Sequence, residues 1–394
     1  MGIETVSNNG FDIAVLDGAL TVSELASLTP ALSSLLQEHP QNSIVLDMSK
    51  VTSVDASTSR LLQNIKKKMD AANRRLYLLN PDEEQLSQLN PPGSTSPIPV
   101  INSISELQEN VNLNTFKRYL PYAYEDEGGQ LRLRLSCGVC GSSNVFGYLI
   151  NKNDFEWKWP SEDYFPECVF TESGESFDFF GALPIVCTEC LTTSIEIANF
   201  NVVDENNTIK YHSTFNDQIK LLLSKTIKKR KKILEEINVT IGDSFFKYPR
   251  NRMATLYCYL LAESCSRIAS VNYNDSDMFT VGYLNYIALL YCEKTMKQGL
   301  IDNCRTFLTQ VVSAPDRYNL IQLAQSYYII FVSSLSLGKF KDLSKIMENY
   351  TDLIEQAGTV SDTPNSLDSP SFWFNRADEI WKNEISSKSS AIVL

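Results

Sequence analysis

Histidine is almost missing from this chain, since only His39 and His212 occur among 394 residues. Neither lies beside a cysteine motif, an acidic cluster or a nucleophile, so the sequence offers no basis for imidazole metal catalysis or a Ser-His-Asp triad. The 16 glycines are scattered singly, and no glycine-rich loop has the spacing that holds a phosphate. We therefore expect a protein that is not an enzyme.

Long apolar runs and an apolar leader are missing too. The best candidate for a membrane span, residues 327–332, is far shorter than the ~20 residues that a spanning helix needs. The first ten residues, MGIETVSNNG, have neither the basic nor the apolar part of a secretory signal. These absences predict a cytoplasmic protein without membrane contact.

Positive charge is scarce. Lys and Arg number 35 against 47 Asp and Glu, which gives a formal net charge of −12. Such a chain repels phosphate backbones unless its basic residues are concentrated locally. Affinity of the whole chain for nucleic acid is therefore disfavoured.

The first 110 residues or so alternate between strand and helix patterns. The expected strands cover residues 11–17, 43–48, 76–80 and 99–101, and the expected helices cover 21–37, 55–73 and 103–111. Strands that alternate with helices predict an α/β sheet packed by helices. The total length predicts two to four domains, so further domains are expected after this one.

The same segment resembles a STAS domain, the fold of bacterial anti-sigma factor antagonists. The resemblance rests on IVLDMSKVTSVDAS, in which Asp47 ends a buried strand and Val54 and Asp55 precede a helix, and on the later RLYLLN and PVINSISEL. It implies a mixed sheet with helices over residues 1–112, and a protein partner such as an anti-sigma factor or kinase. In that family a Ser or Thr directly after the aspartate is phosphorylated, whereas Ala56 stands there in this chain.

Three hydroxyl residues follow Ala56 and form a possible phosphorylation or docking site. These are Ser57, Thr58 and Ser59, directly after Asp55 and Ala56. A phosphate would add about two negative charges at the start of the helix and so change docking. The alternative is a capping cluster, in which Asp55 and these side chains satisfy the free N–H groups of the first helical turn.

A polar stripe on that helix is a second candidate for partner binding. Arg60, Gln63, Asn64 and Lys67 have the spacing of one helix face, opposite the apolar residues of the same helix. The alternative is an ordinary solvated face.

The middle of the chain has two Cys-x-x-Cys pairs. Nine cysteines in a large chain favour reduced thiols and metal ligation over disulfides. The pairs are Cys137 with Cys140 and Cys187 with Cys190, and four thiolates on two facing turns suit one tetrahedral, structural Zn²⁺. A redox dithiol and unligated buried thiols remain as alternatives. The segment resembles a zinc ribbon.

The 46 residues between the two pairs exceed the separation in compact ribbons. This insertion is rich in aromatic residues, and we expect it to pack on the ribbon as a hydrophobic cap. Residues 121–200 contain 13 acidic against 4 basic side chains, so this surface is expected to repel DNA.

From residue 215 onward the composition is helical. The only basic run of the chain lies here and comprises Lys228, Lys229, Arg230, Lys231 and Lys232. It could bind an anionic partner or form a solvated face. Farther on, two helical units that break at Gly299 and Gly338 suggest a repeat of 39 residues and resemble tetratricopeptide (TPR)-like hairpins.

The predicted architecture is multidomain: α/β, then a small β zinc ribbon, then all-α. The domains are 1–112 (STAS-like), 113–205 (zinc-ribbon-like with the aromatic insertion), 206–357 (helical, TPR-like) and 358–394 (linker and a terminal docking helix at 372–381). The favoured function is that of a non-enzymatic bacterial regulatory or scaffold protein that acts by protein–protein interaction. Two alternatives remain: a nucleic-acid-binding regulator that uses the ribbon and the basic helix, and an enzyme with an unrecognised site in the insertion.

Overall fold

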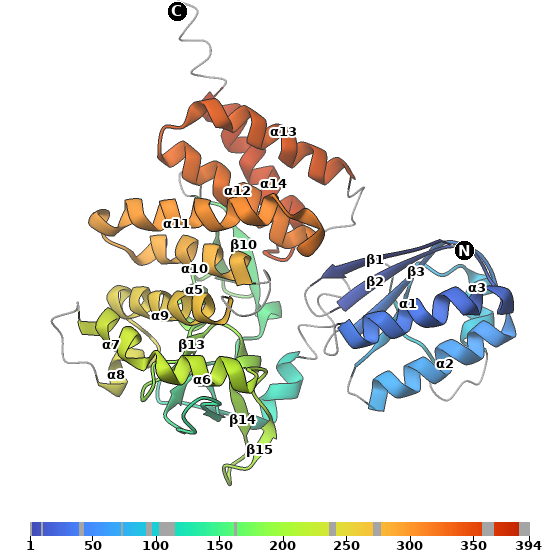
Figure 1. The fold of residues 1–394 in the computed structure, drawn as a ribbon, viewed down its shortest axis with the longest axis horizontal. Coiled ribbons are helices and arrows are strands. Elements are labelled where there is room, and N and C mark those ends of the chain that lie inside the picture. The colour runs from blue at the N-terminus through green and yellow to red at the C-terminus, as the bar shows by residue number, and fades with distance from the viewer. Residues whose placement is uncertain are drawn as a thin grey trace, which may run out of the picture. The chain divides into compact units, whose positions relative to one another are not determined.

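The chain divides into two compact units, which a computed structural model describes over residues 2–8, 11–38, 43–71, 74–91, 97–101, 115–160, 164–235, 242–270, 277–356 and 366–385. One unit is Met1–Val111, and the other holds most of the remaining chain (Figure 1). The helix expected at 103–111 and the first part of the linker expected at 358–371 lie outside the described residues.

The first unit contains a five-stranded mixed sheet. Its strands follow the order β1 (Gly2–Asn8), β2 (Phe11–Leu20), β3 (Ser43–Val54), β4 (Leu76–Leu79) and β5 (Val100–Ile101). β1 pairs with β2 in antiparallel fashion, whereas the other neighbours are parallel. Residues 44–46 and all four residues of β4 are buried, as expected for strands covered on both faces.

Among the described residues, the helices that accompany this sheet are α1 (Leu25–Glu38), α2 (Ala56–Ala71) and α3 (Glu83–Leu89), with a 3₁₀ turn η1 (Val22–Glu24) before α1. Helices α1 and α2 lie along the same face of the sheet (Figure 1). Leu28, Leu32, Leu62 and Met69 form one buried cluster with strand residues such as Leu46. The apolar stripes of both helices therefore face the sheet, which is the arrangement that the sequence pattern predicts.

Two elements of this unit were not expected from the sequence. Strand β1 carries little hydrophobic signal because Gly2, Glu4 and Thr5 are exposed at the sheet edge. Helix α3 is too short for a clear period, although Asp82 caps it through a complete capping box with Gln85.

In the second unit, a helical segment at residues 115–119 is followed by short strands. They are β6 (Ala123–Glu125), β7 (Leu131–Leu133), β8 (Leu135–Ser136), β9 (Val145–Phe146), β10 (Phe155–Lys158), β11 (Glu167–Phe170), β12 (Ile185–Cys187), β13 (Thr193–Ser194), β14 (Asn201–Val203) and β15 (Ile209–Tyr211). The 3₁₀ turns among and before them are η2 (Leu120–Tyr122), η3 (Lys152–Asp154) and η4 (Ile197–Asn199). The strands pair into small sheets, with the orders β13-β12-β9, β15-β14-β8, β10-β11 and β6-β7.

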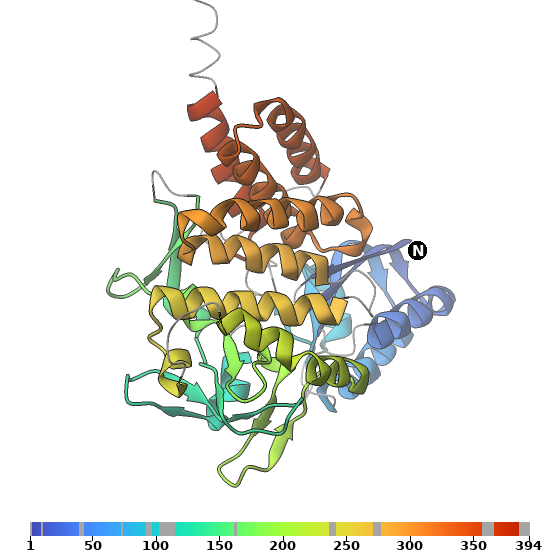
Figure 2. The ribbon, with the colours of Figure 1, turned by 60° about the vertical axis from the view of Figure 1, so that its left-hand side comes forward.

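Helices make up the rest of this unit. They are α5 (Phe179–Ala182), α6 (Asp217–Lys225), α7 (Ile227–Glu235), α8 (Asp243–Phe246), α9 (Arg252–Ser270), α10 (Asp277–Tyr291), α11 (Lys294–Val312), α12 (Leu320–Ser336), α13 (Phe340–Gln356) and α14 (Pro370–Ile380), with a 3₁₀ turn η5 (Pro315–Arg317) and a π turn η6 (Trp381–Ile385). Figures 1 and 2 both show α9, α10 and α11 side by side. Across the described chain, no helix combines the length and apolar character needed to cross a bilayer.

The helical hairpins differ from the expected repeat. Gly299 lies inside α11, and the turn of that hairpin falls at Cys292 and Glu293 instead, so the 39-residue period between glycines is wrong. A Cβ at Gly299 would meet nothing within 4 Å, which means that this glycine sits on an open surface where it costs a helix only about 1 kcal/mol. The sequence pattern predicts the end of a helix at Gly299, whereas this glycine is an exposed position in the interior of α11.

The strands β9 and β12 lie between two hydrophobic cores. Val145 and Ile185 face a small core of residues 113–205, the part of the chain predicted as a ribbon and here called the ribbon segment. The next residues, Phe146 and Val186, face the large core of the helices. Because successive side chains of a strand point to opposite faces, one small sheet serves both cores. The ribbon segment and the helices consequently form one compact unit.

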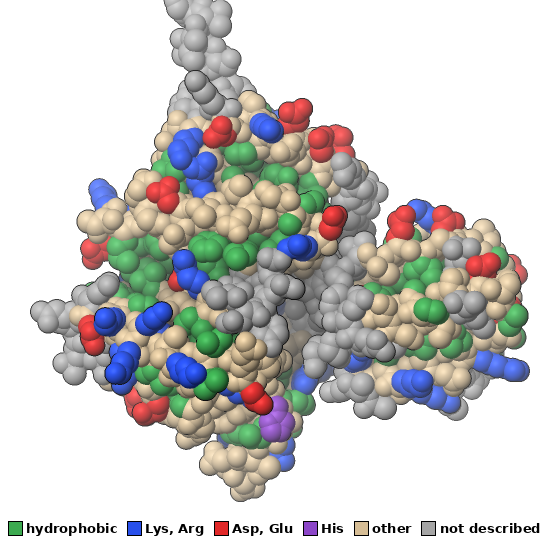
Figure 3. Space-filling model, in the orientation of Figure 1, with side chains coloured by type: hydrophobic (Ala, Val, Ile, Leu, Met, Phe, Trp, Pro, Cys, Tyr) green, Lys and Arg blue, Asp and Glu red, His purple; other side chains and the backbone are tan. Residues whose placement is uncertain are grey.

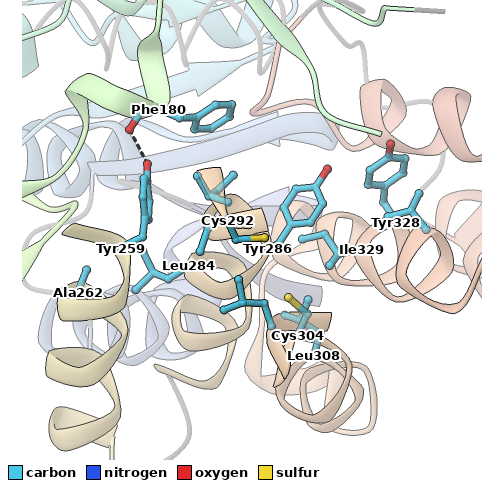
Figure 4. Packing of buried hydrophobic residues seen from close by; sticks show 14 of the residues in the cluster. Phe180, Tyr259, Ala262, Leu284, Tyr286, Cys292, Cys304, Leu308, Tyr328 and Ile329 are labelled. Atoms are coloured by element: carbon cyan, nitrogen blue, oxygen red, sulfur yellow. Dashed lines mark hydrogen bonds between the residues drawn. The ribbon is translucent and has the colours of Figure 1, made fainter. Parts of the chain in front are cut away.

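The aromatic insertion packs chiefly on the helices, which corrects the expectation that it caps the ribbon. Trp159 contacts Phe372 and Trp373, with ring centroids 4.9 and 5.6 Å apart. The Tyr164 carbonyl accepts hydrogen bonds from the hydroxyls of Tyr286 and Tyr328. Figure 4 shows how the helical core is built around these tyrosines and how Tyr259 reaches the Phe180 carbonyl, at 2.7 Å. Buried hydroxyls need such partners, and the backbone of the insertion supplies them.

Helix α14 packs back on this same core. Trp373 and Ala377 are fully buried, and the Phe374 ring meets Tyr350 edge-on at 5.0 Å. The Ser369 hydroxyl accepts the Phe372 N–H and begins the helix. The apolar face of α14 is therefore buried within the unit.

Candidate functional site

The two Cys-x-x-Cys turns have the same backbone geometry. The N–H of Gly141 donates to the Cys137 carbonyl, and Cys137 N–H donates to the Ser142 carbonyl. In the second turn Leu191 N–H donates to the Cys187 carbonyl, and Cys187 N–H donates to the Thr192 carbonyl. The residue after each second cysteine has a positive φ, 77° at Gly141 and 57° at Leu191.

These turns bring all four sulfurs together, within 4.8 Å of one another. The Sγ–Sγ distances are 3.5 Å for Cys137 with Cys190 and 3.5 Å for Cys140 with Cys187. Both are too long for a disulfide, and all four cysteines are free. Tetrahedral Zn²⁺ with Zn–S bonds of about 2.3 Å would hold its sulfurs about 3.8 Å apart, so the cluster fits such an ion.

Hydrogen bonds join the sulfurs to one another and to neighbouring groups. The Val139 N–H donates to Cys137 Sγ at 3.4 Å, and the Thr192 hydroxyl lies 3.1 Å from Cys190 Sγ. Hydrogen bonding with Cys137 raises the pKa of Cys187 and lowers that of Cys190 to about 2. A divalent cation that replaces the thiol protons would bind all four sulfurs at once.

Leu191 departs from the glycine that the ribbon resemblance favours at this position. A left-handed backbone costs a non-glycine residue of order 1–2 kcal/mol. Its side chain is only 4% exposed and belongs to the large helical core, whereas Gly141 makes no such contact. Burial of a leucine is worth about 1.5–3 kcal/mol, which offsets the strain and fastens this turn to the helices.

Arg230 is the residue of the basic run that the sequence placed wrongly. Its side chain is fully buried, so it is not part of an exposed patch. Nε and Nη2 donate to the Cys190 carbonyl at 3.1 and 2.9 Å, Nη2 donates to the Leu223 carbonyl at 2.7 Å, and Nη1 donates to Thr226 Oγ1 at 3.0 Å. The sequence does contain a signal for this burial, because Arg230 lies three or four residues from Ile227, Ile233 and Leu234 and so shares their helix face.

The other four members of the run are exposed on α7. They are Lys228, Lys229, Lys231 and Lys232. In Figure 3 the Lys and Arg side chains gather over α7 and the adjoining end of α6. Within the described residues none of these four lysines forms an ion pair. The described acidic side chains of the ribbon segment therefore do not pair with them.

Asp55 joins the starts of two helical segments in the first unit. One carboxylate oxygen accepts the Thr58 N–H at 2.7 Å and so caps α2, and the other accepts the Val22 N–H at 2.7 Å at the start of η1. The hydrogen bond from Thr58 is the main cause that lowers the pKa of Asp55. The geometry is the capping arrangement that was the alternative to a phosphorylation site.

The three hydroxyl residues after Ala56 lie in different environments. Thr58 is fully buried and donates to the Leu20 carbonyl at 3.0 Å, so it is not part of the surface. Ser59 donates to the Gln88 carbonyl at 2.9 Å. Ser57 is half-buried, and its hydroxyl forms no hydrogen bond within the part of the chain that the structure describes.

The polar stripe of α2 is mostly exposed. Arg60, Asn64 and Lys67 face solvent, whereas Gln63 is half-buried and its amide donates to the Leu89 carbonyl at 2.9 Å. Gln63 therefore ties α2 to α3, and the three other residues form the exposed stripe of α2.

A surface hollow of about 450 Å³ lies beside the insertion. Its acidic residues are Glu167 and Asp178. Asp178 already accepts the Gly181 N–H at 2.9 Å and the Tyr291 hydroxyl at 2.6 Å, which makes it a helix cap. Cys168 also lines the hollow, and burial raises the pKa of its thiol to about 12, which keeps the thiol protonated near neutral pH.

Comparison with known proteins supports the assignment of the first unit. The family model of the STAS domain matches residues 3–106, and the N-terminal STAS domain is thereby confirmed. A solved structure, the anti-sigma factor antagonist SpoIIAA in its unphosphorylated form, is similar over 28% of this chain and 96% of its own, with 14% identity and a TM-score of 0.23. No curated protein matches the chain. The chain thus contains a STAS domain joined to a larger unit with a four-cysteine cluster.

Proposed function

We propose that this chain is a non-enzymatic bacterial regulatory protein of the cytoplasm, which binds a protein partner through its STAS domain. The observation that carries the proposal is the STAS match over residues 3–106, together with an exposed stripe at the start of α2. The partner class suggested by the family is an anti-sigma factor or a kinase, in a partner-switching arrangement.

The docking surface that we propose is Arg60, Asn64, Lys67 and the adjacent Ser57. Asp55 holds this surface in place because it fixes the first turn of α2 against η1. A phosphate on Ser57 would add negative charge within one turn of Arg60. Ser57 is thus the acceptor that we propose for any regulation, in place of the family position that Ala56 occupies.

Capture by the tagged full-length chain tests the docking surface. Asn64→Arg and Lys67→Glu should each reduce capture of the anti-sigma factor or kinase at least tenfold, because each introduces a new charge at the interface. Lys345→Glu, an exposed change on α13, is the matched control and should leave capture intact. Equal capture by all three variants would contradict the proposal.

We further propose that Cys137, Cys140, Cys187 and Cys190 hold one structural Zn²⁺. Four sulfurs close every position of a tetrahedral ion, so the ion would stabilise the fold and supply no catalytic site. Metal analysis of the purified chain should find one zinc per chain, and Cys187→Ser should abolish it. Cys258→Ser, which changes a buried thiol of α9 outside the cluster, should keep the zinc. Clearly less than one zinc in the unchanged protein would overturn the proposal.

Nucleic-acid binding is the alternative that the four exposed lysines of α7 favour. Such binding would weaken steeply with salt, since it releases counterions from the phosphates. Titration of the full chain with DNA and RNA at low and physiological salt decides between the two functions. No binding at either salt would leave the protein–protein function as proposed.

A further inference from the structure

Arg230 carries a buried charge that no carboxylate balances. Its guanidinium is fully buried, and its hydrogen bonds end on two backbone carbonyls and one hydroxyl. Within the described residues no Asp or Glu forms an ion pair with it. A buried charge without a counter-charge costs several kcal/mol, so an arrangement of this kind needs a compensating negative group nearby.

The end of α6 supplies only a part of that compensation. The Leu223 carbonyl belongs to the last turn of α6, where the helix dipole amounts to at most about half a negative charge. The guanidinium also contacts the neutral hydroxyl of Thr226 and the carbonyl of Cys190, which is itself one of the four clustered cysteines. The cluster is therefore the neighbouring group that can provide the rest.

We propose that Arg230 is the counter-charge and anchoring residue of the four-cysteine metal centre, an inference that rests on the proposed Zn²⁺ site. Four thiolates around one divalent cation have a net charge of −2, and a buried charge of this sign needs compensation as much as the buried guanidinium does. Each group thus lowers the cost of burying the other. The forked contact with the Cys190 carbonyl also fixes the turn that presents Cys187 and Cys190.

A second contact supports this anchoring role. Cys265 of α9 accepts the Thr193 N–H at 3.4 Å on the other side of the same turn. The second Cys-x-x-Cys turn is thus held from α7 through Arg230 and from α9 through Cys265. The first turn, by contrast, ends in Gly141 with open space around it. The two turns are alike in backbone but only the second is fastened to the helices by these contacts.

The proposal predicts reciprocal coupling between Arg230 and the metal. If the metal stabilises the buried guanidinium, removal of the guanidinium weakens the metal site by the same factor. Arg230→Met keeps the length of the side chain and removes its charge. Arg230→Lys keeps the charge but loses the pair of N–H donors that bind the Cys190 carbonyl.

The test measures zinc transfer from the full chain to a chromophoric chelator, with zinc per chain as the starting value. Arg230→Met should lower zinc affinity about 10–100-fold, the range found when groups that orient metal ligands are removed. Arg230→Lys should give a smaller loss. Lys231→Met, an exposed neighbour, and Arg376→Met, a buried arginine of α14 paired with Glu379, should transfer zinc as the unchanged chain does.

The outcomes separate the two proposals. A chain that binds no zinc before any substitution overturns the metal site and, with it, the role of Arg230. A chain that binds one zinc, and whose Arg230→Met and Arg230→Lys variants both keep the unchanged zinc affinity, overturns the role of Arg230 alone. If Arg230→Met does not fold, circular dichroism reveals this and the Arg230→Lys variant decides.

Discussion

At the scale of single residues, the same chemical type has different roles according to its partners. Arg230 and its four lysine neighbours are equivalent by composition, yet one is buried against the Cys190 carbonyl and the others face solvent. Asp55 and Asp82 both cap helices, but Asp55 uses both carboxylate oxygens on two segments, whereas Asp82 uses one. Such differences decide which substitutions matter.

Substitution of Asp55 by Asn is predicted to lower the stability of the first unit. An amide retains one accepting oxygen for the Thr58 N–H, but its NH₂ group then faces the Val22 N–H, and two donors oppose each other. Asp82→Asn is the matched control, since Asn is an equally good cap where one oxygen suffices. Urea denaturation at neutral pH should show a lower midpoint for Asp55→Asn and little change for Asp82→Asn.

The pH dependence of that difference follows from the pKa of Asp55. The folded state lowers this pKa, so the ionised carboxylate contributes stability above its ordinary value, near 4. That contribution is lost as the pH falls through the folded value. The midpoint difference between the unchanged chain and Asp55→Asn should therefore be constant from pH 5 to 7 and shrink below pH 4. A difference that grows on acidification would contradict this account.

At the scale of elements, α10 and α11 show how one residue type can have opposite effects in a single helical hairpin. Gly282 lies where α10 meets α11, and a Cβ there would come within 2.6 Å of the Leu308 side chain. Gly299 lies on the open face of α11. Close approach of the two helices therefore requires glycine at the first position and not at the second.

The two glycines predict opposite changes in stability on substitution by alanine. Gly282→Ala should destabilise the second unit by about 1–3 kcal/mol, because the added methyl overpacks the helix contact. Gly299→Ala should stabilise it by about 0.5–1 kcal/mol, since alanine favours the helix and meets no neighbour. Denaturation of the two variants beside the unchanged chain measures both effects. A loss of stability in both would show that α11 does not continue through Gly299.

Elements with a strong local pattern could be predicted from sequence, and those that depend on distant contacts could not. The helical period places α2 close to its observed bounds, and the buried run predicts β3 and β4. The spacing of the cysteines predicts which four come together. The packing of the insertion against α12 and α14 leaves no periodic signal, because its aromatic residues would suit any apolar surface.

Positions within the candidate sites show the same limit. Thr58 and Ser57 both carry a hydroxyl, but Thr58 is buried and donates to the Leu20 carbonyl, which lies 38 residues away in sequence. The burial of Arg230 was signalled by its apolar helix neighbours, but its acceptor, the Cys190 carbonyl, lies 40 residues away in sequence. Local sequence patterns indicate which residues are buried, but they seldom indicate which residues those side chains contact.

At the scale of the whole molecule, the two units have separate cores, and only the second contains the cysteine cluster. Metal removal should therefore act on one unit. Closing the ring from Cys137 to Cys190 restricts the unfolded chain, and zinc binding by such sites contributes directly to folding free energy. We expect chelation to lower the unfolding temperature of the second unit strongly and that of the STAS domain not at all.

Calorimetry of the full chain with and without a chelator measures this directly. Two transitions are expected, and each is assigned by a destabilising substitution, Leu62→Ala for the first unit and Leu308→Ala for the second, both of which remove fully buried side chains. Only the transition that Leu308→Ala shifts should respond to the chelator, and the Cys187→Ser chain should begin at the chelated value. A chelator that lowers both transitions equally would mean that the STAS domain depends on the proposed metal centre for its stability, in which case the docking surface proposed on α2 would itself be sensitive to zinc.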